Sequence, residues 1–228
     1  MGDKLHIDII TIFPSMVRGF LDESIMKRAA QHSAVAFRVI NLRDFTSDRH
    51  QTVDDRPYGG GPGMIMKPEP LFKAVESVRT PGARVILMAP QGRPFRQARA
   101  AELARERHLI FLCGHYEGVD ERVSLGLVTD EISIGDYILT NGTLAAAVVI
   151  DAVVRLLPNV LGAEDATVNE SFNDNRLEYP QYTRPEIFRD LRVPDILLTG
   201  DHAAIARWRE EQSHRRTAAR RPDILKKV

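Results

Sequence analysis

Two glycine-bearing loops, each at the end of an apolar strand-like run, are the stretches of this sequence best suited to bind a ligand. The runs are Leu109–Cys113 and Glu131–Ile134, and the second leads through the loop Gly135–Thr143 into a long apolar helix. Glycine lets a ligand approach the backbone closely, and in α/β proteins such loops lie at the carboxyl ends of strands. Two such loops at the same edge of one sheet predict a single pocket built from both.

A glycine cluster farther upstream, Gly59–Gly63, lies in the polar stretch Asn41–Lys67, which is long for a loop inside a domain. Its backbone can adopt positive φ angles and approach a flat or anionic ligand. No Gly-Lys-Ser/Thr sequence follows, so the cluster does not match a phosphate-binding loop. The residue pattern leaves open whether this is a binding loop or a mobile one.

The helix predicted for Leu144–Leu157 is apolar on nearly all sides, which indicates a buried helix or one that meets another subunit. Asp151 and Arg155 interrupt it with a spacing of four residues, which places them on the same face. They either pair with each other or place charge beside the ligand loop, where a catalytic group would be useful.

The stretch Gly162–Asn175 is polar and has no hydrophobic periodicity, which predicts a linker. It contains Glu170 close to Phe172, an aromatic residue with no core to belong to. A linker that becomes ordered when substrate binds would use both side chains.

Charge is balanced over the whole chain, with 31 basic and 31 acidic residues, but not along it. From Ala203 onward there are eight lysines and arginines against three acids. A basic C-terminal part favours a polyanionic partner, although a solvated helical face would show the same composition.

The runs that position these loops alternate between strand and helix patterns. Strands are predicted at Leu5–Phe13, Ala34–Ile40, Arg84–Met88 and the two runs named above. Helices are predicted at Met16–Ala30, Glu69–Val78, Gln97–Arg107 and Leu144–Leu157. This alternation indicates a mostly parallel sheet with helices on both faces, in which ligands bind at the carboxyl ends of the strands. From Tyr182 a small helical module is predicted, with Asp201 capping a helix over Ala203–His214.

A single cysteine, Cys113, excludes an internal disulfide and fits a reducing compartment. It ends an apolar run, so it is predicted to be buried and unreactive. The sequence shows no signal peptide and no apolar run of membrane-spanning length, and we expect a cytoplasmic protein.

Four motifs in order along the chain resemble the bacterial tRNA (guanine-N1)-methyltransferase family, TrmD. They are YGGGPGM at Tyr58–Met64, GHYEGVDER at Gly114–Arg122, SIGDYIL at Ser133–Leu139 and YTRP at Tyr182–Pro185. The resemblance covers nearly the whole chain, and it is the combination of long motifs that makes it specific.

The fold implied by the resemblance is an α/β domain of the SPOUT class with a deep C-terminal trefoil knot, followed by a small all-helical C-terminal domain. The chain would divide into a knotted methyltransferase domain at residues 1–162, a flexible linker at 163–175 and a tRNA-binding domain at 176–228. The resemblance also implies a homodimer in which each active site is shared between two chains. Residue patterns alone do not suggest a knot, because knots are almost absent from proteins.

The resemblance implies S-adenosylmethionine as cofactor and the guanosine immediately 3′ of the tRNA anticodon (position 37) as substrate, methylated at N1. The implied cofactor-binding residues are Leu87, Ala89, Pro90, Gly114, Tyr116, Ser133, Ile134, Gly135, Asp136, Tyr137, Ile138, Leu139, Asn141 and Gly142. Dependence on Mg²⁺ is also implied, although no Mg²⁺ site stands out in the sequence.

Two catalytic residues are implied. Glu170 occupies the place of the family's aspartate, the general base that takes the proton from guanine N1. Arg155 matches the arginine that stabilises charge developing on guanine O6. Substrate contacts are implied for Gly59, Glu117, Asp174 and Arg184. Asp174 is also the fallback candidate for the base.

Three positions depart from the family pattern. Glu170 keeps the carboxylate but adds one methylene, so the backbone must shift to keep the base in place. Asn141 stands where glycine is common, and asparagine tolerates positive φ better than other residues. His115 stands where arginine is often found, which removes a fixed charge.

Two alternatives remain at this point. One is another knotted methyltransferase that acts on ribose hydroxyls or on ribosomal RNA, which would lack the Tyr58–Met64 motif and the Glu-Ser-Phe linker. The other is a nucleotide- or RNA-binding regulatory module without catalysis, which explains the glycine loops and the basic C-terminal part. It does not explain a carboxylate and an arginine around a cofactor pocket.

Overall fold

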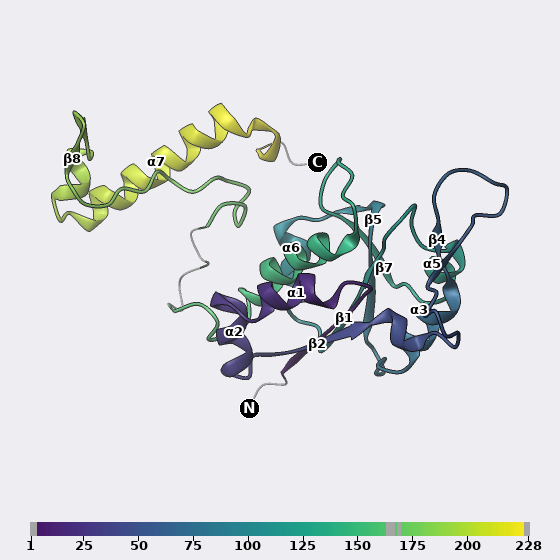
Figure 1. Ribbon diagram of the computed structural model, residues 1–228. Helices are drawn as coiled ribbons and strands as arrows, with labels where there is room; N and C mark the ends of the chain where they lie inside the picture. The colour runs from purple at the N-terminus through teal and green to yellow at the C-terminus, as the bar shows by residue number, and fades with distance from the viewer. Residues whose placement is uncertain (1–3, 163–166, 168–169, 226–228) are drawn as a thin grey trace. The chain divides into compact units, whose positions relative to one another are not determined.

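Five parallel strands form the central sheet of the N-terminal part of the chain in the computed structural model (Figure 1). The strand order is β2-β1-β6-β5-β7, and every neighbouring pair is parallel. These strands are β1 (Leu5–Thr11), β2 (Val35–Asn41), β5 (Arg84–Pro94), β6 (His108–Cys113) and β7 (Asp130–Ser133). The prediction of a mostly parallel α/β sheet is confirmed.

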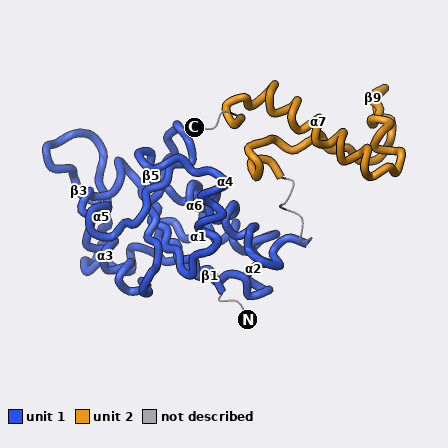
Figure 2. Tube along the Cα trace, turned by 180° about the vertical axis from the view of Figure 1, so that it is seen from behind, with its two compact units in different colours: residues 1–164 blue, residues 165–228 orange. Residues whose placement is uncertain are grey.

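The structure describes residues 4–162, 167 and 170–225, and the chain divides into two compact units (Figure 2). The first unit spans residues 1–164 and the second spans residues 165–228. Much of the predicted linker at 163–175 lies outside the described residues, as do Lys226 and Lys227 of the basic C-terminal part.

Helices cover both faces of the sheet because the side chains of the buried strands alternate between the faces. On β6, Leu109 and Phe111 belong to one hydrophobic cluster, while Ile110 and Leu112 belong to the other. The first cluster is completed by α1 (Pro14–Leu21), α2 (Ser24–Gln31), α4 (Gln97–Leu103) and α6 (Gly142–Val154). The second is completed by α3 (Pro68–Glu76) and α5 (Glu121–Gly126).

The first helical region was predicted as a single helix over Met16–Ala30, but the structure has two helices there. It consists of α1 and α2, which Asp22 and Glu23 separate, and Ser24, the first residue of α2, has a φ of 47° that one continuous helix could not include. Pro14 begins α1, where its missing N–H does not remove a hydrogen bond of the helix.

Strand β5 is longer than the predicted Arg84–Met88, because Ala89–Pro94 continues it instead of forming a loop. Its pairing with β7 shifts register between Met88 and Arg93, both of which pair with Ile132. The irregularity lets a proline-containing segment remain in the sheet. Helix α5, directly after the Glu117 loop, was not predicted.

The polar stretch 41–67 contains short regular elements. They are the 3₁₀ turn η1 (Leu42–Phe45) and the antiparallel pair β3 (Asp54–Asp55) and β4 (Ile65–Met66). Val53 and Met66 are buried and anchor the stretch in the second hydrophobic cluster. Tyr58, by contrast, is fully exposed at the start of the glycine cluster.

Helix α6 is capped by Asn141, whose side chain accepts a 2.9 Å bond from the Thr143 N–H. Of the two alternatives predicted for this helix, burial on all sides within the chain is excluded, and contact with another subunit stays a prediction. Leu144 and Val148 are 51% and 50% exposed and lie on one face of the helix, and Asp151 on the next turn is also exposed.

The resemblance implied an all-helical second unit, but this unit also contains a two-stranded antiparallel hairpin. The hairpin consists of β8 (Ile187–Phe188) and β9 (Leu191–Arg192). It is followed by η2 (Asp195–Leu198), α7 (His202–Arg220) and η3 (Pro222–Ile224). Helix α7 extends beyond the predicted Ala203–His214, and Asp201 caps it as predicted by accepting a 3.0 Å bond from the Ala204 N–H.

Cys113 is confirmed as buried, at 3% exposure beneath α6. Burial raises the pKa of its thiol to about 12, against the opposing effect of a hydrogen bond with Thr143. The reactive thiolate is therefore scarce in the folded protein at pH 8. We expect iodoacetamide to leave the native protein unmodified for hours and to alkylate it fully in denaturant, as followed by intact mass. Rapid labelling of the native state would contradict this packing.

Candidate functional site

A cavity of about 610 Å³ lies beside the carboxyl ends of β6 and β7 and the irregular middle of β5 at Leu87–Gln91. Because β5 lies between β6 and β7 in the sheet, these three segments lie side by side. All the residues that the resemblance implied for the cofactor line this cavity except Asp136. They are Leu87, Ala89, Pro90, Gly114, Tyr116, Ser133, Ile134, Gly135, Tyr137, Ile138, Leu139, Asn141 and Gly142.

The two loops on either side of the cavity are tied to each other by backbone bonds. The Gly142 N–H donates to the Gly114 carbonyl over 2.8 Å, and His115 and Asn141 form an isolated antiparallel bridge. A Cβ on Gly142 would lie 3.0 Å from the Gly114 nitrogen, closer than ordinary van der Waals contact, so glycine favours this approach. Asn141 has an extended backbone with φ at −163°. This position therefore does not require the positive φ that asparagine tolerates.

Glu117 also lines the cavity, in the turn that follows β6. Its backbone N–H donates to the Met64 carbonyl over 3.0 Å, which joins this turn to the end of the glycine cluster. Gly59 does not line the cavity and lies in the exposed part of that cluster. The structure therefore brings Glu117 to the cofactor residues but leaves Gly59 outside them.

Helix α5 begins immediately beyond Glu117 and is capped by Asp120. The Arg122 guanidinium donates to both oxygens of the Asp120 carboxylate over 2.8 Å and lowers the pKa of that carboxyl. Glu121 and Ser124, on the first turns of the helix, line the cavity. An acidic N-cap followed by an acidic first turn is a helix-start signature, and it could have revealed α5 in the sequence.

Several other lining residues escaped the sequence analysis. They are Met88, Gln91, His115, Gly118, Val119, Ile132, Thr140 and Ala145. His115 was considered only for a lost charge. Its Nδ1 is buried and has no hydrogen-bond partner among the described residues. Its ring instead packs at right angles against Phe13, with ring centroids 5.1 Å apart.

Arg155 is the C-terminal cap residue of α6 and is half-buried. Its backbone N–H donates to the Asp151 carbonyl over 3.2 Å, which continues the helical turn. Asp151 is exposed, so it is not a charge in the interior of the helix packing.

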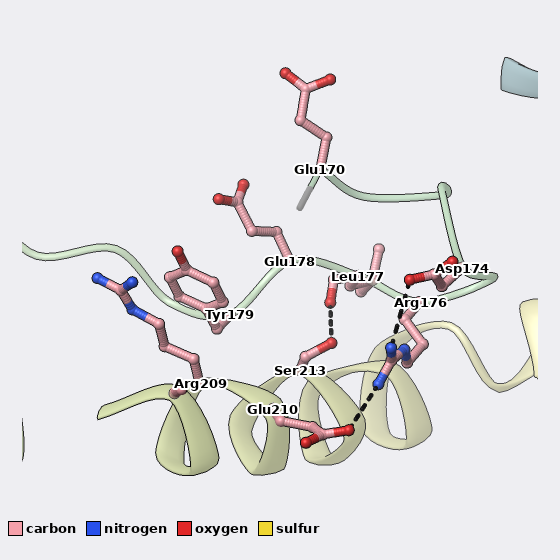
Figure 3. Close-up of a pocket in the computed structure, with 10 residues that line it drawn as sticks. Glu170, Asp174, Arg176, Leu177, Glu178, Tyr179, Arg209, Glu210 and Ser213 are labelled. Atoms are coloured by element: carbon pink, nitrogen blue, oxygen red, sulfur yellow. Dashed lines mark hydrogen bonds and ion pairs between the residues drawn. The ribbon is translucent and has the colours of Figure 1, made fainter. Parts of the chain in front are cut away.

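In the second unit, Glu170 and Asp174 both line a hollow of about 320 Å³ against helix α7 (Figure 3). Arg176 forms ion pairs across this hollow with Asp174 at 3.6 Å and Glu210 at 3.7 Å. The side chain of Glu170 points away from α7, whereas that of Asp174 points toward Arg176 (Figure 3). The two candidate bases therefore have different surroundings.

Aromatic rings of the second unit carry arginines on their faces. The Arg209 guanidinium lies 4.8 Å from the centroid of the Tyr179 ring, and the Arg221 guanidinium lies 5.7 Å from that of Phe172. Phe172 thus has a partner, although it has no core. Arg184 lines a separate hollow of about 520 Å³ that includes Tyr182.

Among residues 4–162, 167 and 170–225, no group of three or more His, Cys, Asp or Glu side chains is arranged to hold a metal ion. No helix there is long and apolar enough to cross a membrane.

The chain matches known proteins over almost its full length. The sequence model of the family described as tRNA (Guanine-1)-methyltransferase TrmD matches residues 5–227. A tRNA (guanine-N(1)-)-methyltransferase of Geobacillus kaustophilus is 58% identical over 223 residues, covering 97% of this chain and 91% of the relative. Those of Brevibacillus brevis and Moorella thermoacetica are 58% and 57% identical and cover 98% of this chain and 93% and 91% of their own. The chain belongs to the tRNA (guanine-1)-methyltransferase TrmD family.

Proposed function

We propose that this protein transfers a methyl group from S-adenosylmethionine to N1 of the guanosine immediately 3′ of the tRNA anticodon. The observation that carries the proposal is the cavity beside the ends of β6 and β7 and the middle of β5, which gathers all the implied donor-binding residues except Asp136, together with Glu117, around one space. The relatives' names support guanine N1 of tRNA as the target.

The cavity fits the proposed donor in size and chemistry. Its volume lies within the range of about 300–1,000 Å³ that small-molecule sites occupy. Leu87 and Ile132 supply apolar walls, and the turns at Gly114 and Gly135 present backbone donors and acceptors. The unpartnered Nδ1 of His115 lies in the same wall, and a bound polar group or water would give it a partner. When bound, S-adenosylmethionine supplies an electrophilic methyl group.

The remaining chemistry is assigned to side chains of this protein. Guanine N1 carries a proton at neutral pH, so a base must take that proton as the methyl group arrives. We assign this role to the Glu170 carboxylate. Asp174 is the weaker candidate because its carboxylate faces Arg176. The Arg155 guanidinium would stabilise the negative charge that develops on guanine O6.

Recognition of the guanine is assigned to Glu117, whose carboxylate oxygens accept from the N–H donors of the base edge. The target base must leave its stack to reach the cavity, as is general for enzymes that modify bases. The exposed Gly59 would approach the base from its own loop, and Arg184 would contact the tRNA from the second unit. Dependence of the reaction on Mg²⁺ also stays a proposal, and only the family resemblance supports it.

A homodimer with shared active sites is the assembly that we propose. The exposed apolar face of α6, with Leu144 and Val148, supports it, because such residues are commonly covered by a partner. A trefoil knot is likewise proposed for the first unit, formed where the segment at Gly142 packs against Gly114. The domain division at 162 and 176, with a flexible linker between, also remains a proposal, as does a cytoplasmic location.

The basic residues of α7 provide a test of tRNA binding. Arg215 and Arg221 are already paired with Glu211 and Asp223, whereas Arg216 and Arg220 line a hollow of about 370 Å³. We expect an Arg216→Ala/Arg220→Ala variant to weaken tRNA binding and to reduce the salt slope of log Kd by about one per lost phosphate contact.

The matched control is Arg215→Ala/Arg221→Ala, which removes the same formal charge. It should change the slope less, because each of these arginines already faces a carboxylate. An unchanged slope in the Arg216→Ala/Arg220→Ala variant would show that these two arginines do not contact phosphates.

The proposed reaction is tested by incubating the purified protein with bulk tRNA and labelled S-adenosylmethionine, followed by nuclease digestion and mass spectrometry. The expected product is 1-methylguanosine. A methyl group on a ribose hydroxyl would instead support a different RNA methyltransferase reaction.

A further inference from the structure

The end of the glycine cluster and the Glu117 turn form one backbone-paired assembly, although they are far apart in the sequence. The Met66 N–H donates to the Gly118 carbonyl over 2.9 Å, and the Asp120 N–H donates to the Met66 carbonyl over 3.0 Å. Met66 is 1% exposed, so this pairing is anchored in the core. With the bond from the Glu117 N–H to Met64, the two segments are held in a fixed register.

Within this assembly, the side chain of Glu117 lies in the space where Gly63 lacks a side chain. A Cβ on Gly63 would lie 2.3 Å from Glu117 Oε1, 2.4 Å from its Cγ and 2.7 Å from its Cδ. All three distances are far below van der Waals contact, and all three atoms belong to a flexible side chain. A Cβ at residue 63 would therefore displace the Glu117 carboxylate rather than the backbone.

We propose that Gly63 is a positioning residue that fixes the Glu117 carboxylate where it accepts from the guanine edge, which makes Gly63 a determinant of base specificity. The inference rests on the role proposed for Glu117. The φ of +79° at Gly63 favours glycine, but that requirement alone does not explain why a carboxylate fills the adjacent space.

The chemical reason is that guanine carries a donor, the N2 amino group, beside N1, whereas adenine carries no amino group at that position. A carboxylate oxygen accepts from the N2 amino group only at one distance and orientation, and this contact leaves the N1 proton to Glu170. Adenine presents an acceptor at N1, which a carboxylate repels. A carboxylate held by Gly63 thus selects guanine, whereas a displaced one loses both rate and selectivity.

The test compares Gly63→Ala with Gly82→Ala. Gly82 has a φ of +80° and no atom within 4 Å of the space a Cβ would take, so it reproduces the backbone strain without any contact to Glu117. We expect Gly63→Ala to lower kcat/KM for a guanosine transcript by about 100-fold, the cost of misplacing a contact group by about 1 Å. Gly82→Ala should lower it by less than about two-fold, with a similar loss of Tm in both variants.

Three further measurements distinguish a positioning role from general damage to the protein. Donor binding by calorimetry should be unchanged in Gly63→Ala, and the preference for guanosine over inosine, which lacks the N2 amino group, should fall toward unity. In a Glu117→Ala background, Gly63→Ala should produce no further loss, because its target is already gone.

Two results would overturn the positioning role. One is that the losses in kcat/KM of Gly63→Ala and Glu117→Ala multiply in the double variant. The other is that Gly82→Ala lowers kcat/KM as much as Gly63→Ala does. A wild-type protein that methylates no guanosine would instead overturn the proposed function, so the two failures are distinguishable.

Discussion

Glu170→Gln is expected to lower methyl transfer to tRNA by about 10²–10⁴-fold, the usual contribution of a general base. The amide has nearly the shape of the carboxylate but cannot take the proton from guanine N1. Donor binding should remain within about two-fold of wild type, because Glu170 belongs to the second unit and not to the cavity at the strand ends. Single-turnover transfer of labelled methyl and calorimetric donor binding measure the two effects separately.

Glu210→Gln is the matched control, since Glu210 lines the same hollow and carries the same substitution. It should retain activity within a few-fold. Glu170→Asp, which restores the family's residue, should also remain active. Full turnover in Glu170→Gln together with loss in Asp174→Asn would move the base to Asp174.

Mixing inactive chains is expected to restore activity if Arg155 and Glu170 reach each site from different subunits. An Arg155→Ala chain and a Glu170→Gln chain would each form inactive homodimers. A mixed dimer would contain one site with both substitutions and one site with neither. The two chains would be coexpressed with different tags, and the mixed dimer purified through both tags. It should show about half the wild-type activity per dimer, because one of the two symmetry-related sites is intact.

The control is a tagged dimer of Arg155→Ala with itself, which should remain inactive through the same purification. An inactive mixed dimer would indicate that both residues serve a site within one chain. A monomeric wild-type protein in sedimentation experiments would contradict the shared-site proposal at its first step.

The parallel sheet was predictable because its strands are continuous apolar runs. Leu109–Cys113 and Val85–Met88 are buried on both faces, and Gly114 places a turn at the end of the first run. The cavity was predictable for the same reason, since Gly114 and Gly135 follow β6 and β7, the two strands on either side of β5. Which side chains complete the cavity depended on α5, whose Asp120 cap is a local signal that was overlooked.

Other features depend on contacts that no local pattern encodes. The break between α1 and α2 occurs at Asp22 and Glu23, where the local sequence is compatible with a continuous helix. Strand β5 continues through Pro90 because a register shift beside Ile132 accommodates it. The hairpin at Phe188 and Leu191 is too short for alternation to appear. The packing of Glu117 against Gly63 links two segments that only the folded chain brings together.

The residues of α6 show where sequence reasoning misjudged burial. Leu144 and Val148 are as apolar as their buried neighbours, yet each is half-exposed in the isolated chain. Composition reports that a surface is apolar but does not say whether the same chain or another one covers it.

The most direct test is methyl transfer from labelled S-adenosylmethionine to two tRNA transcripts, one with guanosine and one with adenosine immediately 3′ of the anticodon. We predict methylation of the guanosine transcript alone, mapped to N1, which would show that the carboxylate of Glu170 serves where the family has aspartate. Donor binding without methylation of either transcript would contradict this account, because the cavity would then belong to a protein that binds the donor but does not transfer its methyl group.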